Sequence, residues 1–186
     1  MSRRQGAGGE ILNSSLPHPS PHHRVPADRQ RSAPRPRINH HFLVIGYGND
    51  LRSDDGVGQR VADEVASWAI PNLRSLAVHQ LTPELAELIA SMQTVIFVDA
   101  YPVAQGGKIV QVCQLKVEAD NLNLGHISNP PSLLALAQLL YSHAPPAWLV
   151  TVPAVNFELG ENLSEIAQQG LAAALEQIRW LIQSAN

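Results

Sequence analysis

The sequence is poor in several residue types, and each shortage narrows the class of protein. Among its 186 residues there is one cysteine, Cys113, which excludes an intramolecular disulfide framework and a zinc site built from cysteines. Aromatic residues make up 5% and charged residues 16%, so the core must consist mainly of aliphatic side chains. No run approaches the ~18 apolar residues of a membrane-spanning helix, so we expect no integral membrane protein.

What the chain does contain is enough apolar sequence for a single core. Apolar types make up 45% of the residues. Because a domain usually comprises roughly 100–200 residues, the length predicts one globular domain and little more.

Charge is distributed unevenly along the chain. Residues 1–38 carry seven arginines and two acids, whereas residues 39–186 carry six basic and 14 acidic side chains. The acidic part does not favour nucleic acid as a partner and suits a basic segment or a metal cation better. Residues 1–38 also hold six prolines, three histidines and no aromatic residue. We therefore predict a disordered tail over 1–38 and a folded domain over 39–186.

Short apolar runs alternate with amphipathic segments after residue 39. The apolar runs are continuous instead of alternating with polar residues, which is typical of parallel strands buried on both faces. We predict an α/β protein, a three-layer α/β/α fold with a mostly parallel central sheet. The expected strands are 42–46, 76–79, 94–98, 108–115 and 148–152, and the expected helices follow Ser53–Asp55, run from 82 to about 92 and over 131–141, and run from 163 to about 182.

Several side chains in these helices have predicted structural roles. Val57, Val61 and Val65 recur at helical spacing and should face the core. We expect one of Ser53, Asp54 and Asp55 to cap that helix, and Ser164 to cap the last one. In the helix over 131–141, Leu133, Leu134 and Leu140 are expected to point inward.

Polar groups follow three of these elements, where α/β proteins gather their functional side chains. Asp54 and Asp55 follow the first strand, Asp99 follows the strand 94–98, and His126 precedes the third helix. A buried strand that ends in an acid is costly unless the carboxylate is paired or bound to a metal. Two carboxylates and an imidazole together suit a divalent transition ion such as zinc, nickel, manganese or iron.

The loop after the first strand also permits a nucleotide-binding interpretation. Gly46 and Gly48 match the start of a dinucleotide-binding motif, but Leu51 stands where the third glycine belongs, and the nearby aspartates would repel phosphates. We therefore expect no nucleotide cofactor and expect these glycines to permit a tight turn and close packing.

Five ordered blocks of the sequence resemble the nickel-iron hydrogenase maturation endopeptidases, and the resemblance covers about residues 41–183. The last two blocks are most similar to the branch that serves bidirectional, NAD(P)-linked hydrogenases. The blocks are Val44–Gly58, Leu81–Leu85, Phe97–Ala100, Gly125–His126 with Leu133–Leu134, and Val155–Gly160.

The resemblance implies a cytoplasmic α/β/α enzyme that removes a C-terminal peptide from the hydrogenase large-subunit precursor after nickel insertion. It implies that Asp55, Asp99 and His126 contact the nickel, which the precursor carries, and that these three residues form the catalytic site. The chain departs from some members at His79–Gln80, where they have two glycines. We expect His79 to be an ordinary strand-end residue. We also expect a monomer, because the enzyme must dock transiently on a larger partner.

The chemistry stays open at this point. The nickel ion could polarise the scissile carbonyl or a water molecule, or an aspartate could act as the general base while the metal only positions the peptide. Cys113 lies in an apolar run, where a thiol is usually inert. Two other classes are a non-catalytic nickel-binding maturation chaperone and a small nucleotide-binding domain.

Overall fold

The computed structural model describes residues 42–117 and 128–184, so the predicted tail and His126 lie outside the described residues. All described residues belong to the compact unit that contains residues 37–186. Five strands of this part form one sheet in the order β2-β1-β3-β5-β4. The strands are β1 (Phe42–Tyr47), β2 (Leu73–Val78), β3 (Thr94–Pro102), β4 (Gln111–Leu115) and β5 (Ala147–Ala154).

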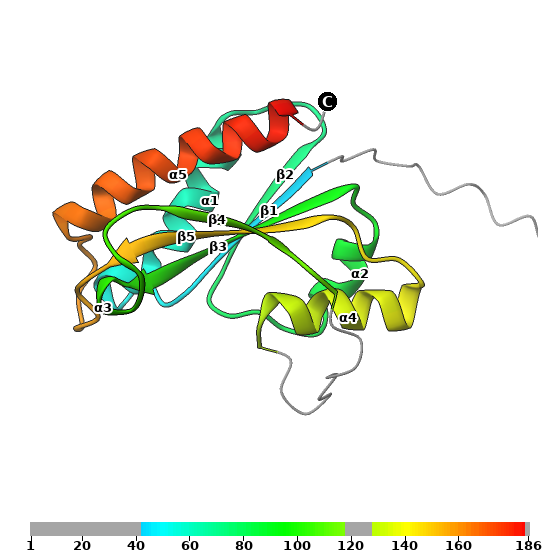
Figure 1. The fold of residues 1–186 in the computed structure, drawn as a ribbon, viewed down its shortest axis with the longest axis horizontal. Helices are drawn as coiled ribbons and strands as arrows, with labels where there is room; N and C mark the ends of the chain where they lie inside the picture. Colours follow the sequence, from blue (N-terminus) through cyan, green and yellow to red (C-terminus); the bar gives the residue numbers. More distant parts are fainter. Residues whose placement is uncertain (1–41, 118–127, 185–186) are drawn as a thin grey trace, which may run out of the picture. The chain divides into compact units, whose positions relative to one another are not determined.

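The sheet is parallel except at one edge. The pairs of β1 with β2, β1 with β3, and β3 with β5 are all parallel, while β4 runs antiparallel to β5. This arrangement confirms the predicted mostly parallel sheet, and it places the carboxyl ends of β1, β3 and β5 at one common edge. We call it the carboxyl edge; it lies on the left in Figure 1.

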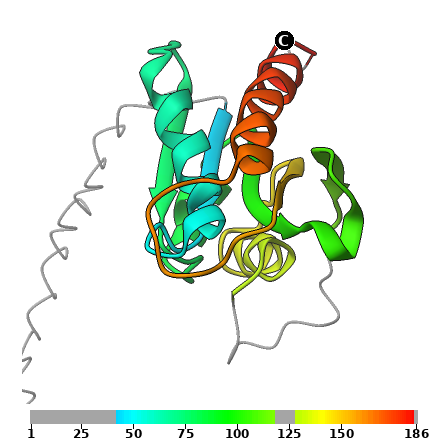
Figure 2. The same cartoon turned by 90° about the vertical axis from the view of Figure 1, so that its left-hand side faces the viewer.

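Helices cover both faces of the sheet. Helices α1 and α5 lie side by side on one face, and α2 and α4 lie on the other (Figures 1 and 2). This is the predicted three-layer α/β/α architecture. The helices are α1 (Val57–Ser67), α2 (Leu85–Ala90), α3 (Val103–Gly106), α4 (Pro130–Tyr141) and α5 (Glu165–Ser184), and a short 3-10 helix, η1 (Ser53–Gly56), precedes α1.

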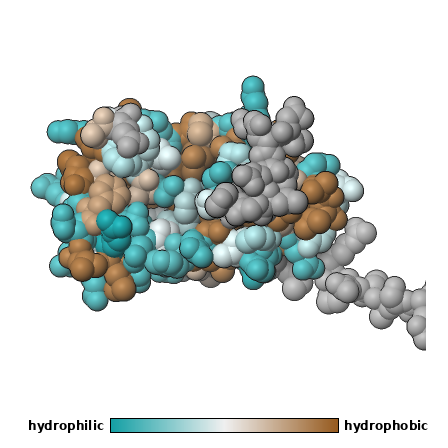
Figure 3. All heavy atoms as spheres, turned by 90° about the horizontal axis from the view of Figure 1, so that it is seen from below, coloured by the Kyte–Doolittle hydropathy of each residue, from teal (hydrophilic) through white to brown (hydrophobic). Residues whose placement is uncertain are grey.

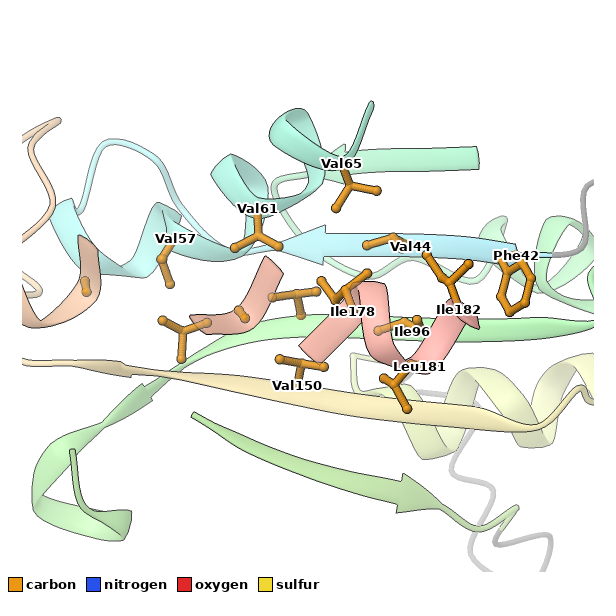
Figure 4. Packing of buried hydrophobic residues seen from close by; sticks show 14 residues of the cluster. Phe42, Val44, Val57, Val61, Val65, Ile96, Val150, Ile178, Leu181 and Ile182 are labelled. Carbon is orange, nitrogen blue, oxygen red and sulfur yellow. The ribbon is translucent and has the colours of Figure 1, made fainter. Parts of the chain in front are cut away.

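The core between the sheet and the first helix pair confirms the helical spacing of the valines. Val57, Val61 and Val65 project from α1 toward β1 and α5, where Val44 and Ile178 meet them (Figure 4). All five side chains are at most 1% exposed. At about 25 cal/mol per Å² of apolar surface, each such side chain contributes roughly 1.5–3 kcal/mol of burial free energy.

The opposite face shows one wrong prediction. Leu133 and Leu134 are fully buried against the sheet, as expected, but Leu140 is 60% exposed. Leu140 lies on the same side of the helix as Leu133, so the helical periodicity was correct. Burial on α4 ends at Ala137 because the last turn of the helix extends past its packed neighbours.

Two element boundaries also differ from the predictions near the carboxyl edge. Strand β3 does not end at Val98 but continues through Asp99 to Pro102, because β5 pairs with it as far as Ala154. Helix α2 begins at Leu85, after a turn in which the Leu85 amide donates to the Thr82 carbonyl. Among the described residues, no helix is long and apolar enough to span a membrane.

Candidate functional site

Asp99 lies where β3 leaves its partner β1. The paired register of these two strands ends at Gly46 and Val98, so the next residues, Tyr47 and Asp99, are neighbours at the carboxyl edge. The Tyr47 hydroxyl donates a hydrogen bond to the Asp99 carboxylate. Burial raises the pKa of Asp99 to about 6, with a smaller upward contribution from the charge of Asp55, and the hydrogen bonds from Tyr47 and the Ala100 amide oppose that rise. Asp99 is therefore a half-buried carboxylate beside a second negative charge.

Asp55 reaches this edge from the loop after β1. Its Oδ2 accepts a hydrogen bond of 2.9 Å from the Asn49 amide. Gly48, with φ of +136°, makes the approach possible, because a Cβ atom there would lie 1.9 Å from the Asp55 carbonyl oxygen. The charge of Asp55 acts on Asp99, so these two carboxylates lie near each other, and their role in a common site with His126 stays a prediction. We call these two side chains the Asp55–Asp99 pair.

Asp54, next to Asp55 in the chain, is 0% exposed and has a different role. Its carboxylate accepts bonds of 2.9 Å from the amides of Val155 and Asn156, 2.6 Å from the Ser164 amide and 2.7 Å from the Ser164 hydroxyl. Burial alone would raise the pKa of Asp54, but these hydrogen bonds outweigh burial and lower it. We call this arrangement the Asp54 clamp.

The Asp54 clamp corrects one prediction and confirms another. No side chain of the Ser53–Asp55 segment caps η1 or α1, because Asp54 binds the loop before α5 instead. The Ser164 hydroxyl accepts a bond of 3.2 Å from the Ala167 amide and caps the last helix, as predicted. Of the two adjacent acids, Asp54 accepts four hydrogen bonds, whereas Asp55 accepts one from the Asn49 amide and its charge acts on Asp99.

A pocket of about 480 Å³ opens beside Asp99 on the α4 side of the sheet. Tyr47 forms part of its wall, and sequence reasoning missed this residue. The signal was present: once Gly46 is aligned with Val98 in a parallel pair, the residue after Gly46 must neighbour Asp99. The lining residues are Tyr47, Asp99, Leu115, Asn129, Pro130, Pro131, Ser132 and Leu149.

Three other residues were singled out in the sequence, and the structure describes two of them. His126 lies outside the described residues. His79 is exposed one residue past β2, and β1 separates that strand from β3. Cys113 was expected in an apolar environment, but its thiol is exposed, because β4 is the outermost strand of the sheet.

The glycines after β1 serve close packing, as predicted. A Cβ atom on Gly46 would lie 1.8 Å from the Gly58 carbonyl oxygen, so this glycine lets α1 approach the strand directly. The same contact fixes the start of α1 relative to β1 and hence the position of the loop that carries Asp55.

Two carboxylates give the described part of the site two oxygen ligands. Within residues 42–117 and 128–184, no group of three or more His, Cys, Asp or Glu side chains has a geometry that could hold a metal ion. The Asp55–Asp99 pair can therefore bind a cation only together with a further ligand. Hard oxygen ligands of this kind accept divalent ions.

The comparisons with known proteins agree with this geometry at the level of the fold. No protein-family model and no curated protein matches the sequence. Solved structures do match: the hydrogenase 2 maturation peptidase of Thaumarchaeota archaeon SCGC_AB-539-E09 superposes with a TM-score of 0.60 and 22% identity, covering 77% of this chain and 98% of that one. The hydrogenase maturating endopeptidase HybD of E. coli gives a TM-score of 0.59, 20% identity, and coverages of 78% and 94%.

A third likeness is to the [NiFe] hydrogenase maturation protease HycI of Thermococcus kodakarensis KOD1, with a TM-score of 0.58, 20% identity, and coverages of 77% and 93%. Structures related at this level share a fold. The chain therefore has the fold of the hydrogenase maturation proteases, over nearly their whole length.

Proposed function

We propose that this protein is an endopeptidase that removes the C-terminal peptide of a nickel-iron hydrogenase large-subunit precursor after nickel insertion. The observation that carries the proposal is the Asp55–Asp99 pair at the carboxyl edge. Asp99 lies on β3 and Asp55 lies in the short helix η1 after β1, and the charge of Asp55 disfavours ionisation of Asp99. A cation held between them would relieve that repulsion, and a metal ion seated in the substrate supplies such a cation.

His126 is the third ligand in this proposal. It lies three residues before Asn129, which lines the pocket beside Asp99. Because consecutive Cα atoms are 3.8 Å apart, the chain keeps the Cα atom of His126 within about 11 Å of that of Asn129. An imidazole from this segment is therefore within reach of the carboxyl edge, and it would complete a set of two oxygens and one nitrogen.

The proposed roles follow from this set. Asp55, Asp99 and His126 contact the nickel of the loaded precursor, so the ion serves as a check that the metal centre is complete. The ion supplies Lewis acidity toward the scissile carbonyl or a water molecule. The Tyr47 hydroxyl orients the Asp99 carboxylate, and the pocket beside it receives the peptide to be cut.

Processing of the precursor in vitro tests the proposal. We expect the purified protein to shorten the nickel-loaded large-subunit precursor and leave the nickel-free precursor intact, as read from the mass of the large subunit. Asp55→Asn and His126→Ala should each reduce the rate at least about 100-fold, because each removes a ligand to the ion. Asp63→Asn is the control, since Asp63 is an exposed acid on α1 and belongs to neither the site nor the loops around it.

Two results would contradict the proposal. Nickel binding by the isolated protein with no change in precursor mass would indicate a metallochaperone. Equal shortening of nickel-loaded and nickel-free precursor would leave the peptidase function standing but remove the role of nickel in recognition.

A further inference from the structure

The loop after β5 is bonded tightly to the loop that carries Asp55. Gly160 donates to the Leu51 carbonyl at 3.0 Å and accepts from the Ser53 amide at 2.7 Å. The Ser53 hydroxyl donates to the Glu158 carbonyl at 3.0 Å. With the Asp54 clamp, these bonds hold residues 155–160 in a fixed place. Figure 2 looks onto the carboxyl edge and shows this loop, in orange, running past the start of α1 to α5.

These bonded loops present large apolar side chains to solvent. Leu159 is 87% exposed, Leu51 is 58% exposed and Val155 is 49% exposed. The bond between Leu51 and Gly160 makes Leu51 and Leu159 neighbours along the two loops. Single exposed apolar residues are ordinary, but several that are held rigidly beside a site mark a binding surface.

An apolar pocket of about 490 Å³ continues this surface. It lies at the ends of β3 and β5, where Pro102 pairs with Ala154, three residues past Asp99 on β3. The lining residues are Pro102, Val103, Ala104, Ala154, Val155 and Phe157. We call this pocket, together with Leu51 and Leu159, the apolar rim.

Acidic side chains outnumber basic ones around the apolar rim, where the exposed Arg52 donates from its Nε to the Phe157 carbonyl and two acids lie nearby. Asp50 precedes Leu51 and Glu158 precedes Leu159, and both acids are exposed. An acidic border disfavours an anionic membrane surface and favours an apolar segment with basic neighbours. An occupant of the rim also has a short path to Asp99, since the pocket begins at Pro102, three residues past that carboxylate on β3.

We propose that the apolar rim is the docking surface for the protein substrate: it binds an apolar segment of the precursor that is flanked by basic side chains. This inference rests on the proposed function and specifies how the substrate is held. It predicts that residues outside the Asp55–Asp99 pair determine binding of the precursor and leave the chemical step unchanged.

A pair of double variants tests the docking surface. Leu51→Ser with Leu159→Ser removes the two most exposed leucines of the rim. Leu139→Ser with Leu140→Ser is the matched control, because those leucines are 62% and 60% exposed at the end of α4, near the start of β5 and so at the opposite edge of the sheet. In Figure 3 hydrophobic surface lies in separate patches toward both ends of the view, of which the left end is the carboxyl edge.

Binding of the nickel-loaded precursor is measured by titration calorimetry, and processing is measured by mass. We expect the rim variant to bind at least about tenfold more weakly and to have a raised KM with an unchanged kcat, while the control variant matches the wild type. Glu158→Gln should weaken binding more at low salt than at high salt. The thermal unfolding temperatures of the two double variants should match that of the wild type, because all four substituted leucines are exposed.

The outcomes separate this inference from the proposed function. Cleavage by the wild type with equal binding by the two double variants overturns the docking surface and leaves the peptidase function standing. Binding that depends on the rim without any cleavage supports the docking surface and contradicts the peptidase function. A wild-type dimer that the rim variant converts to a monomer overturns substrate docking in favour of an interface between two copies.

Discussion

The Asp54 clamp and the Asp55–Asp99 pair lie side by side at the carboxyl edge, yet they treat negative charge in opposite ways. The clamp surrounds a fully buried carboxylate with four hydrogen bonds, and the pKa of Asp54 falls in spite of burial. In the pair, burial and the charge of Asp55 raise the pKa of Asp99 by more than its hydrogen bonds lower it, so that this pKa is about 6.

The difference separates a structural carboxylate from a functional one. A charge whose hydrogen bonds are complete stabilises the fold and has nothing left to offer a ligand. A charge held in an unfavourable place reduces stability and is retained where a ligand makes up the deficit. The following changes should therefore act on activity at one region and on stability at the other.

The largest expected effect is on activity, from Asp99→Asn. Removal of this charge should reduce precursor cleavage at least about 100-fold, because the nickel loses an oxygen ligand. The free energy of unfolding should not fall, since the folded state already disfavours the ionised carboxylate. Processing assays and urea unfolding on the same preparation measure both, and a loss of stability that accounts for the inactivity would contradict the assignment.

Asp54→Asn should act on stability instead. An amide cannot accept all four bonds as a carboxylate does, and we expect the free energy of unfolding to fall by roughly 3 kcal/mol. Urea unfolding measures the change. Asp63→Asn, on the exposed side of α1, is the control and should stay within about 0.5 kcal/mol of the wild type.

Acid should remove the advantage of the clamp. Because the pKa of Asp54 is lowered in the folded protein, its stabilisation is complete above the unfolded value of about 3.9 and is lost as pH falls through the folded value. The difference in unfolding free energy between wild type and Asp54→Asn should therefore shrink toward low pH. A difference that stays constant from neutral pH to below the folded pKa would show that packing, and not charge, is responsible.

Tyr47→Phe should have a moderate effect on activity. The ring and its wall of the pocket remain, but Asp99 loses the hydroxyl that orients it. A net hydrogen bond of about 1 kcal/mol corresponds to a roughly fivefold decrease in cleavage rate. Tyr141→Phe, at the exposed end of α4, should leave the rate unchanged. A decrease as large as that of Asp99→Asn would place Tyr47 in the chemistry itself.

The smallest expected effect is that of Cys113→Ala. The thiol is exposed on the outermost strand, and it is not among the residues that line the pocket beside Asp99. Cleavage by the alanine variant should stay within about twofold of the wild type. Inactivation of the wild type by a thiol reagent, with the variant resistant, would contradict this.

The sequence predicted the fold because each element has a strong local signal. Continuous apolar runs such as 94–98 indicated parallel strands, and the valines of α1 indicated a helix with one buried face. The predictions for the end of β3 and for the burial of Leu140 were wrong because both features depend on tertiary contacts. The end of β3 depends on its pairing with β5, and the exposure of Leu140 depends on how far the packed layer extends along α4.

The site could be predicted in part for the same reason. The nearness of Asp55 and Asp99 follows from the rule that parallel strands end at one edge, and in the structure the charge of Asp55 acts on Asp99. The Asp54 clamp could not be predicted, because its donors lie about 100 residues later in the chain. The role of His126 and the branch that serves NAD(P)-linked hydrogenases stay predictions.

The close approach of Gly48 to Asp55 has a consequence for finding the same geometry elsewhere. A methyl group at position 48 would overlap the carbonyl oxygen of an acid seven residues later, so any chain that keeps this acid in place must have a bare α-carbon at that spacing. A glycine followed by a carboxylate at that interval, after an apolar strand, is thus a compact sequence filter. It would identify distant relatives whose overall sequence identity is too low to detect.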